Sequence, residues 1–99
     1  MSNIKLLTSV KKYLRITSIS KDEEVYELIE AAKADMSVAG IDRIDEADPL
    51  IIQAIKDYCR AKFGYGDNTD KAYYEERYNK QKGTLSVSAK YHDYGGANE

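Results

Sequence analysis

The sequence of 99 residues has little of the chemistry that enzymes and metalloproteins use, with one cysteine and one histidine. A single cysteine excludes an internal disulfide and a zinc site built from several cysteines, and a single histidine excludes most histidine-based metal centres. No apolar run approaches the roughly 18 residues that a membrane-spanning helix needs, and no long apolar segment of a secretory signal is visible. Because no nucleophile stands beside a base, we expect no catalytic residue, no metal, no cofactor and no membrane partner.

What is present is typical of one globular domain, with 42% hydrophobic and 32% charged residues. The net charge of −2 gives no general attraction to nucleic acid. The charge is nevertheless divided into blocks. Residues 1–19 contain Lys5, Lys11, Lys12 and Arg15 and no acid, whereas residues 20–48 carry ten acidic residues against three basic ones. Such blocks favour self-association or a charged partner.

Hydrophobic spacing predicts about four helices. Thr8 is a candidate cap for the first, Ser20 and Glu23 form a candidate capping box for the second, and Asp48 followed by Pro49 marks the start of the third. In the second helix, Leu28 is expected to face Ile55 of the third across the core. A loop at residues 64–68 separates the third helix from the fourth. The expected helices span about residues 9–15, 21–38, 49–63 and 69–82.

After Gly83 the pattern changes to an alternation of apolar and polar residues, which is typical of a strand. A single strand has to pair with another chain or remain extended. The sequence therefore predicts an all-α fold, a small bundle of about four helices over residues 1–83. Residues 84–99 are expected to form an extended C-terminal arm and a flexible tail.

The candidate functional residues belong to interfaces. The basic cluster near the N-terminus fits a subunit contact or, less well, nucleic acid, and the acids of the second helix form either a solvated face or a subunit contact. The tyrosines of the fourth helix fit either a partial core or an interface patch, because tyrosine buries area while keeping a polar tip. The alternating segment after Gly83 can add to another chain. The candidate interface residues are Lys11, Lys12, Arg15, Glu23, Glu27, Tyr73, Tyr74, Tyr78, Leu85, Val87 and Tyr91.

The order of these signals along residues 5–91 resembles the head–tail connector (adaptor) proteins of tailed bacteriophages and related prophages, also called DNA-packaging or head-completion proteins. The segments that carry the resemblance are Tyr13-Leu14-Arg15-Ile16, Asp22-Glu23-Glu24-Val25, Leu28-Ile29-Glu30-Ala31-Ala32, Asp48-Pro49-Leu50-Ile51-Ile52-Gln53-Ala54-Ile55, Tyr58, Phe63-Gly64 and Leu85-Ser86-Val87-Ser88.

The resemblance implies an all-helical structural subunit without catalytic activity or cofactor. It implies a homo-oligomeric ring of about twelve copies beneath the portal protein, in the neck of a virion assembled in the bacterial cytoplasm. Such a ring extends the DNA channel, lets DNA pass without specific binding, and receives the next neck or tail-completion protein. The alternative from another class is a small helical regulatory or nucleic-acid-binding protein.

Overall fold

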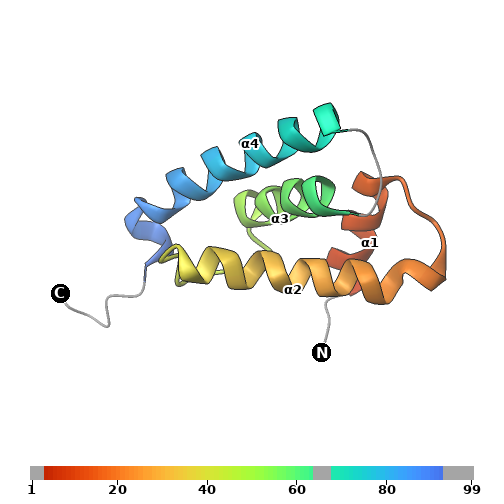
Figure 1. Cartoon of the computed structure of the whole chain (residues 1–99). Coiled ribbons are helices and arrows are strands. Elements are labelled where there is room, and N and C mark those ends of the chain that lie inside the picture. Colours follow the sequence, from red (N-terminus) through yellow and green to blue (C-terminus); the bar gives the residue numbers. More distant parts are fainter. Residues whose placement is uncertain (1–3, 64–67, 93–99) are drawn as a thin grey trace.

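The computed structural model describes residues 4–63 and 68–92, and within these ranges the chain is helical with no strand (Figure 1). The all-α prediction of about four helices is therefore confirmed. Of the expected loop at residues 64–68, residues 64–67 lie outside the described residues, as does the expected flexible tail at residues 93–99, whereas Asn68 already begins the fourth helix. The elements are α1 (Ile4–Leu14), the 3₁₀-helix η1 (Ile19–Lys21), α2 (Asp22–Val38), α3 (Pro49–Lys62), α4 (Asn68–Ser86) and the 3₁₀-helix η2 (Ala89–Tyr91).

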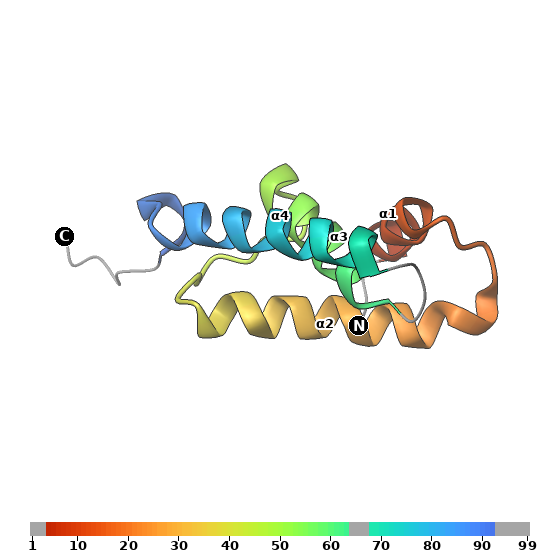
Figure 2. The same cartoon turned by 45° about the horizontal axis from the view of Figure 1, so that its top comes forward.

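Helix α3 lies at the centre and packs against α1, α2 and α4. The molecule is elongated, with extents of 47 × 31 × 19 Å. The segment that leads into α2, drawn in orange, lies at one end, and the last turns of α2 and α4, drawn in yellow and blue, lie at the other (Figures 1 and 2). We call these the η1 end and the α4 end.

The core takes apolar residues from all four helices. In α2 the predicted apolar face is confirmed, because Val25, Ile29, Ala32 and Met36 are buried, whereas Leu28 is only partly buried. Helix α3 is the most deeply buried, as its nearly continuous apolar start indicated. The buried residues of this helix and its end are Ile51, Ala54, Ile55, Asp57, Cys59, Ala61 and Phe63.

Of three predicted helix starts, the one at Asp48-Pro49 is confirmed, and those near Ser9 and at Ser20 are wrong. Asp48 caps α3, since its carboxylate accepts the Leu50 N–H at 2.8 Å and Pro49 opens the helix. The capping box at Ser20 is wrong, because Ser18 caps the preceding turn and places Ser20 inside η1. The first helix begins at Ile4 and not near Ser9. Leu6 and Val10, four residues apart and both buried, extend its apolar face toward the N-terminus.

The extended arm after Gly83 is also a wrong prediction for its described part. Helix α4 continues through Gly83 to Ser86, and η2 follows. Leu85 lies seven residues after the buried Tyr78, so both share one helical face. The N–H groups of Asp42 and Arg43 donate to the Tyr91 carbonyl at 2.8 and 2.9 Å. The segment through Tyr91 is thus folded onto its own chain.

Candidate functional site

Within the described part of the chain, no three His, Cys, Asp or Glu side chains lie close enough together to hold a metal ion. No described helix is both long enough and apolar enough to cross a membrane. The notable features are a buried carboxylate at the helix junction, a group of tyrosines with cations, an acidic face on α2 and an apolar groove.

Asp57 of α3 is fully buried and was missed by the sequence analysis. Its carboxylate accepts hydrogen bonds from three helices, including one from the Tyr13 hydroxyl at 2.6 Å and one from Arg77 Nε at 3.2 Å. Burial of the Tyr13 hydroxyl, together with its hydrogen bond to Asp57, raises the pKa of Tyr13 to about 12. The sequence did hold one signal of its burial: Asp57 lies three residues after Ala54 and four before Ala61, which places it on the buried face of the helix. The four donors are Tyr13, Gln53, Arg77 and Gln81.

A tyrosine–cation cluster covers this carboxylate on the α1, α3 and α4 side. The Tyr74 ring makes edge contacts with Tyr13 and Tyr73, with centroids 6.0 and 5.0 Å apart. The Arg60 guanidinium lies 4.9 Å from the Tyr74 centroid, within cation–π range, and Arg77 lies 5.8 Å from that of Tyr73. The cluster consists of Tyr13, Lys56, Arg60, Tyr73, Tyr74 and Arg77.

The predicted tyrosine stripe of α4 is therefore divided. Tyr73 is exposed and Tyr74 half-buried, so both remain interface candidates. Tyr78 instead belongs to the core, as the alternative interpretation had it, and stacks edge-on against Tyr58 with centroids 5.1 Å apart. Its hydroxyl donates to Asp35 of α2 at 2.6 Å, and Lys82 reaches the same carboxylate at 2.9 Å. These contacts fix α4 to the C-terminal half of α2.

This environment predicts an acid-sensitive contribution of Asp35. The hydrogen bonds from Tyr78 and then Lys82 lower the pKa of Asp35 below its ordinary value. The stability that it contributes is therefore fully present above the unfolded-state pKa near 4 and is lost as the pH falls through the lower folded-state pKa. Because its side chain is 39% exposed, solvent screening limits the effect to about 1 kcal/mol.

Chemical denaturation of the wild type and of Asp35→Asn between pH 7 and pH 2 measures this contribution. We expect the variant to be less stable at pH 7 and the difference to shrink at the lowest pH. Glu27→Gln, on the exposed face of the same helix, is the matched control and should show neither effect. A pH-independent difference between Asp35→Asn and wild type would contradict the assignment.

The predicted basic cluster is split by the fold. Lys11 is largely buried and pairs with Asp22 of the same chain, so one basic residue already meets the acidic block within the subunit. Lys12 and Arg15 are exposed, and Arg15 directly follows α1 with a left-handed backbone (φ 60°). These two remain candidates for a contact with another molecule.

The acidic face of α2 is exposed as predicted and is formed by Glu23, Glu24, Glu27 and Glu30. The arm residues differ from the prediction. Leu85 and Tyr91 are buried in the subunit's own core, and the Tyr91 hydroxyl donates to Asp48 at 2.8 Å. They are therefore unavailable to pair with another chain, whereas Val87 is exposed.

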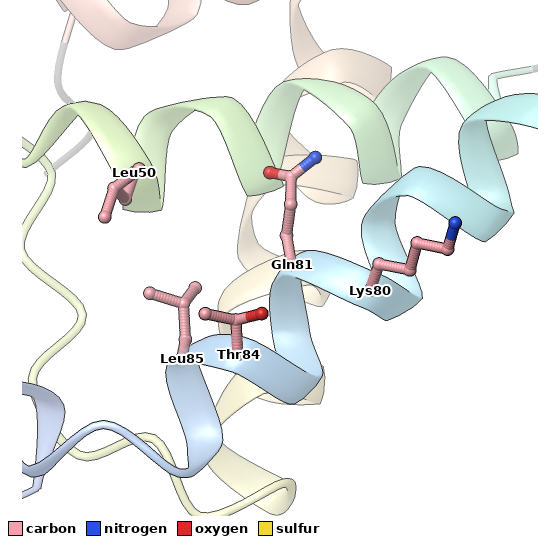
Figure 3. A pocket seen from close by; sticks show the side chains of 5 residues that line it. All are labelled: Leu50, Lys80, Gln81, Thr84 and Leu85. Carbon is pink, nitrogen blue, oxygen red and sulfur yellow. The ribbon is translucent and has the colours of Figure 1, made fainter.

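An apolar groove opens between the start of α3 and the end of α4, with a volume of about 200 Å³ (Figure 3). No pattern in the sequence pointed to it, because it joins residues about 35 positions apart. Its lining consists of Leu50, Lys80, Gln81, Thr84 and Leu85.

The family model described as "phage connector protein" matches residues 6–92, a range that runs from α1 through η2. No curated protein and no solved structure matches the chain significantly.

Proposed function

Since the chain belongs to the phage connector protein family, we propose that it is a structural ring subunit of the head–tail connector. In this proposal it docks beneath the portal protein in the virion neck, extends the DNA channel and receives the next neck or tail-completion protein. The observation that carries the proposal is the family match over nearly the whole described fold. No catalytic step and no cofactor are part of the proposed role.

The charge distribution supports this role physically. Helix α2 presents a row of exposed carboxylates, and a channel wall of that kind repels phosphates, so duplex DNA slides without being gripped. The opposite charges that remain exposed near the end of α1 are Lys12 and Arg15. Exposed ion pairs contribute at most about 1 kcal/mol each, but a ring repeats every contact around its circumference.

The alternative, a nucleic-acid-binding protein, is favoured by one observation. Cations beside aromatic rings, as at Arg60 and Tyr74, also form surfaces that bind single strands. In this chain the two arginines of the cluster already form ion pairs. Arg60 pairs with Asp70 at 3.3 Å, and Arg77 pairs with the buried Asp57. The arginines of the cluster therefore stabilise contacts within the subunit, which leaves them less available to bind a phosphate backbone.

Native mass spectrometry and electron microscopy of the protein, alone and with the portal ring of the same phage, test the proposal. We expect a closed ring of one size on the portal, and weak duplex binding with little dependence on salt. The double variant Lys12→Glu/Arg15→Glu should weaken ring assembly, while Lys71→Glu, at a half-buried position of α4, serves as the charge control. Failure to assemble on the portal, or tight and salt-sensitive duplex binding by the isolated protein, would contradict the proposal.

A further inference from the structure

Large apolar side chains are exposed at both ends of the elongated subunit. Val38 at the end of α2 and Val87 just after α4 belong to the α4 end and are 87 and 83% exposed. Leu50, near the start of α3, is 57% exposed and lines the groove with Leu85. The hydrogen bonds of Tyr91 with Asp42 and Arg43 hold these segments together. The opposite end carries Ile19 in η1, which is 81% exposed. Side chains this exposed gain stability only when another surface covers them.

The groove at the α4 end is suited to one aliphatic side chain. The buried Leu85 of α4 points toward Leu50 of α3, and Thr84 lies beside Leu85 (Figure 3). Its volume of about 200 Å³ exceeds the roughly 150 Å³ of an apolar cavity that holds benzene. An isoleucine side chain has fewer carbon atoms than benzene, so a groove of this volume can accommodate it.

The turn that carries Ile19 is fixed before any contact forms. The Ser18 side chain accepts the Ser20 N–H at 3.2 Å, and the two serine hydroxyls lie 2.6 Å apart. The Asp22 N–H donates to the Ile19 carbonyl. Such pre-organisation removes much of the ordering cost of an inserted side chain.

Charge around the two surfaces is complementary. In η1 itself Ile19 is accompanied by the half-buried Lys21, and the exposed acids Glu23 and Glu24 follow at the start of α2. The groove is lined by Lys80, whose own partner Glu76 is distant at 3.9 Å and equally exposed, so Lys80 is free to turn toward an approaching acid.

We propose that Ile19 of one subunit inserts into the groove between α3 and α4 of the next subunit. The inference rests on the proposed ring function and identifies the surfaces that meet. The segment leading into α2, which contains η1 and Ile19, lies at one end of the subunit, and the last turns of α4, which line the groove, lie at the other (Figures 1 and 2). Each subunit can therefore use one of these surfaces for each neighbour. Contacts of this head-to-tail kind close into rings when the rotation between subunits allows it.

Disulfide trapping in the portal-bound assembly tests the contact. Mixing Ile19→Cys with Thr84→Cys should give a mixed covalent dimer at about tenfold higher yield than mixing Glu27→Cys with Thr84→Cys. The native Cys59 is fully buried and does not compete.

A second test measures ring assembly of charge-insertion variants. Ile19→Asp should weaken ring assembly about tenfold or more, whereas Ala34→Asp, on the exposed side of α2, should not.

The outcomes separate this contact from the ring function itself. A ring on the portal in which the two cysteine mixtures cross-link equally would overturn the Ile19 contact and leave the proposed function standing. Preferential linkage of Thr84→Cys to itself would show a two-fold contact between α4 ends, which also overturns it. Absence of any assembly on the portal would remove both proposals.

Discussion

Replacing Asp57 with alanine is expected to lower the free energy of unfolding by about 3 kcal/mol. The side chain is fully buried and is the shared acceptor of Tyr13, Gln53, Arg77 and Gln81. Its removal leaves donors from three helices without their acceptor in a region of low water access. Arg77 is partly exposed and regains water, which keeps the loss at the lower end of the range for a broken buried pair.

Chemical denaturation at neutral pH measures this loss. Asp57→Asn keeps the shape but turns one acceptor group into a donor, so an intermediate loss is expected. Glu27→Ala, on the exposed face of α2, should stay within about 0.5 kcal/mol of the wild type. A loss below about 1 kcal/mol for Asp57→Ala would show that the carboxylate does not join the helices.

A double-mutant cycle with Tyr13→Phe assigns the interaction more closely. If the 2.6 Å hydrogen bond from Tyr13 to Asp57 carries part of the loss, the double variant is less destabilised than the sum of the two single variants. Helix α4 should respond most, because it docks through Asp57 and Asp35 as much as through its apolar side chains Tyr78 and Leu85. Amide exchange in α4 should therefore accelerate more than in α2.

The features that sequence reasoning predicted correctly are local ones. The Asp48-Pro49 start of α3 depends on a hydrogen bond between residues two positions apart, and the apolar face of α2 depends on the helical repeat alone. The acidic face of the same helix follows from that repeat. Signals of this kind are complete within one or two turns, so no knowledge of the rest of the fold is needed.

The features that were missed depend on distant partners. The alternation after Gly83 fits a strand, but Leu85 also fits the helical face of Tyr78, and the docking of Tyr91 onto residues 42, 43 and 48 favours the folded form. Asp57 similarly needs partners up to 44 residues away to be stable when buried. The groove at Leu50 and Leu85 exists only once α3 and α4 are packed together.

The second large loss of stability is expected from truncating a core side chain. Ile55→Ala is expected to cost about 3–4 kcal/mol, because Ile55 is fully buried between helices and its truncation leaves a cavity in a packed interior. The sequence placed Leu28 opposite Ile55 as an equal core residue, but Leu28 is only partly buried at the margin of the core. Leu28→Ala should therefore cost only about 1 kcal/mol, since water already reaches part of the side chain.

Denaturant unfolding of the two variants at one pH measures the difference, with Leu50→Ala as the control for an exposed leucine at the rim of the groove. Leu50→Ala should change subunit stability by less than about 0.5 kcal/mol. Equal losses for Ile55→Ala and Leu28→Ala would contradict the burial pattern. If the Ile19 contact holds, Leu50→Ala weakens ring assembly without weakening the subunit, whereas Ile55→Ala weakens the subunit itself. The pair thereby distinguishes residues that build the fold from residues that join its copies.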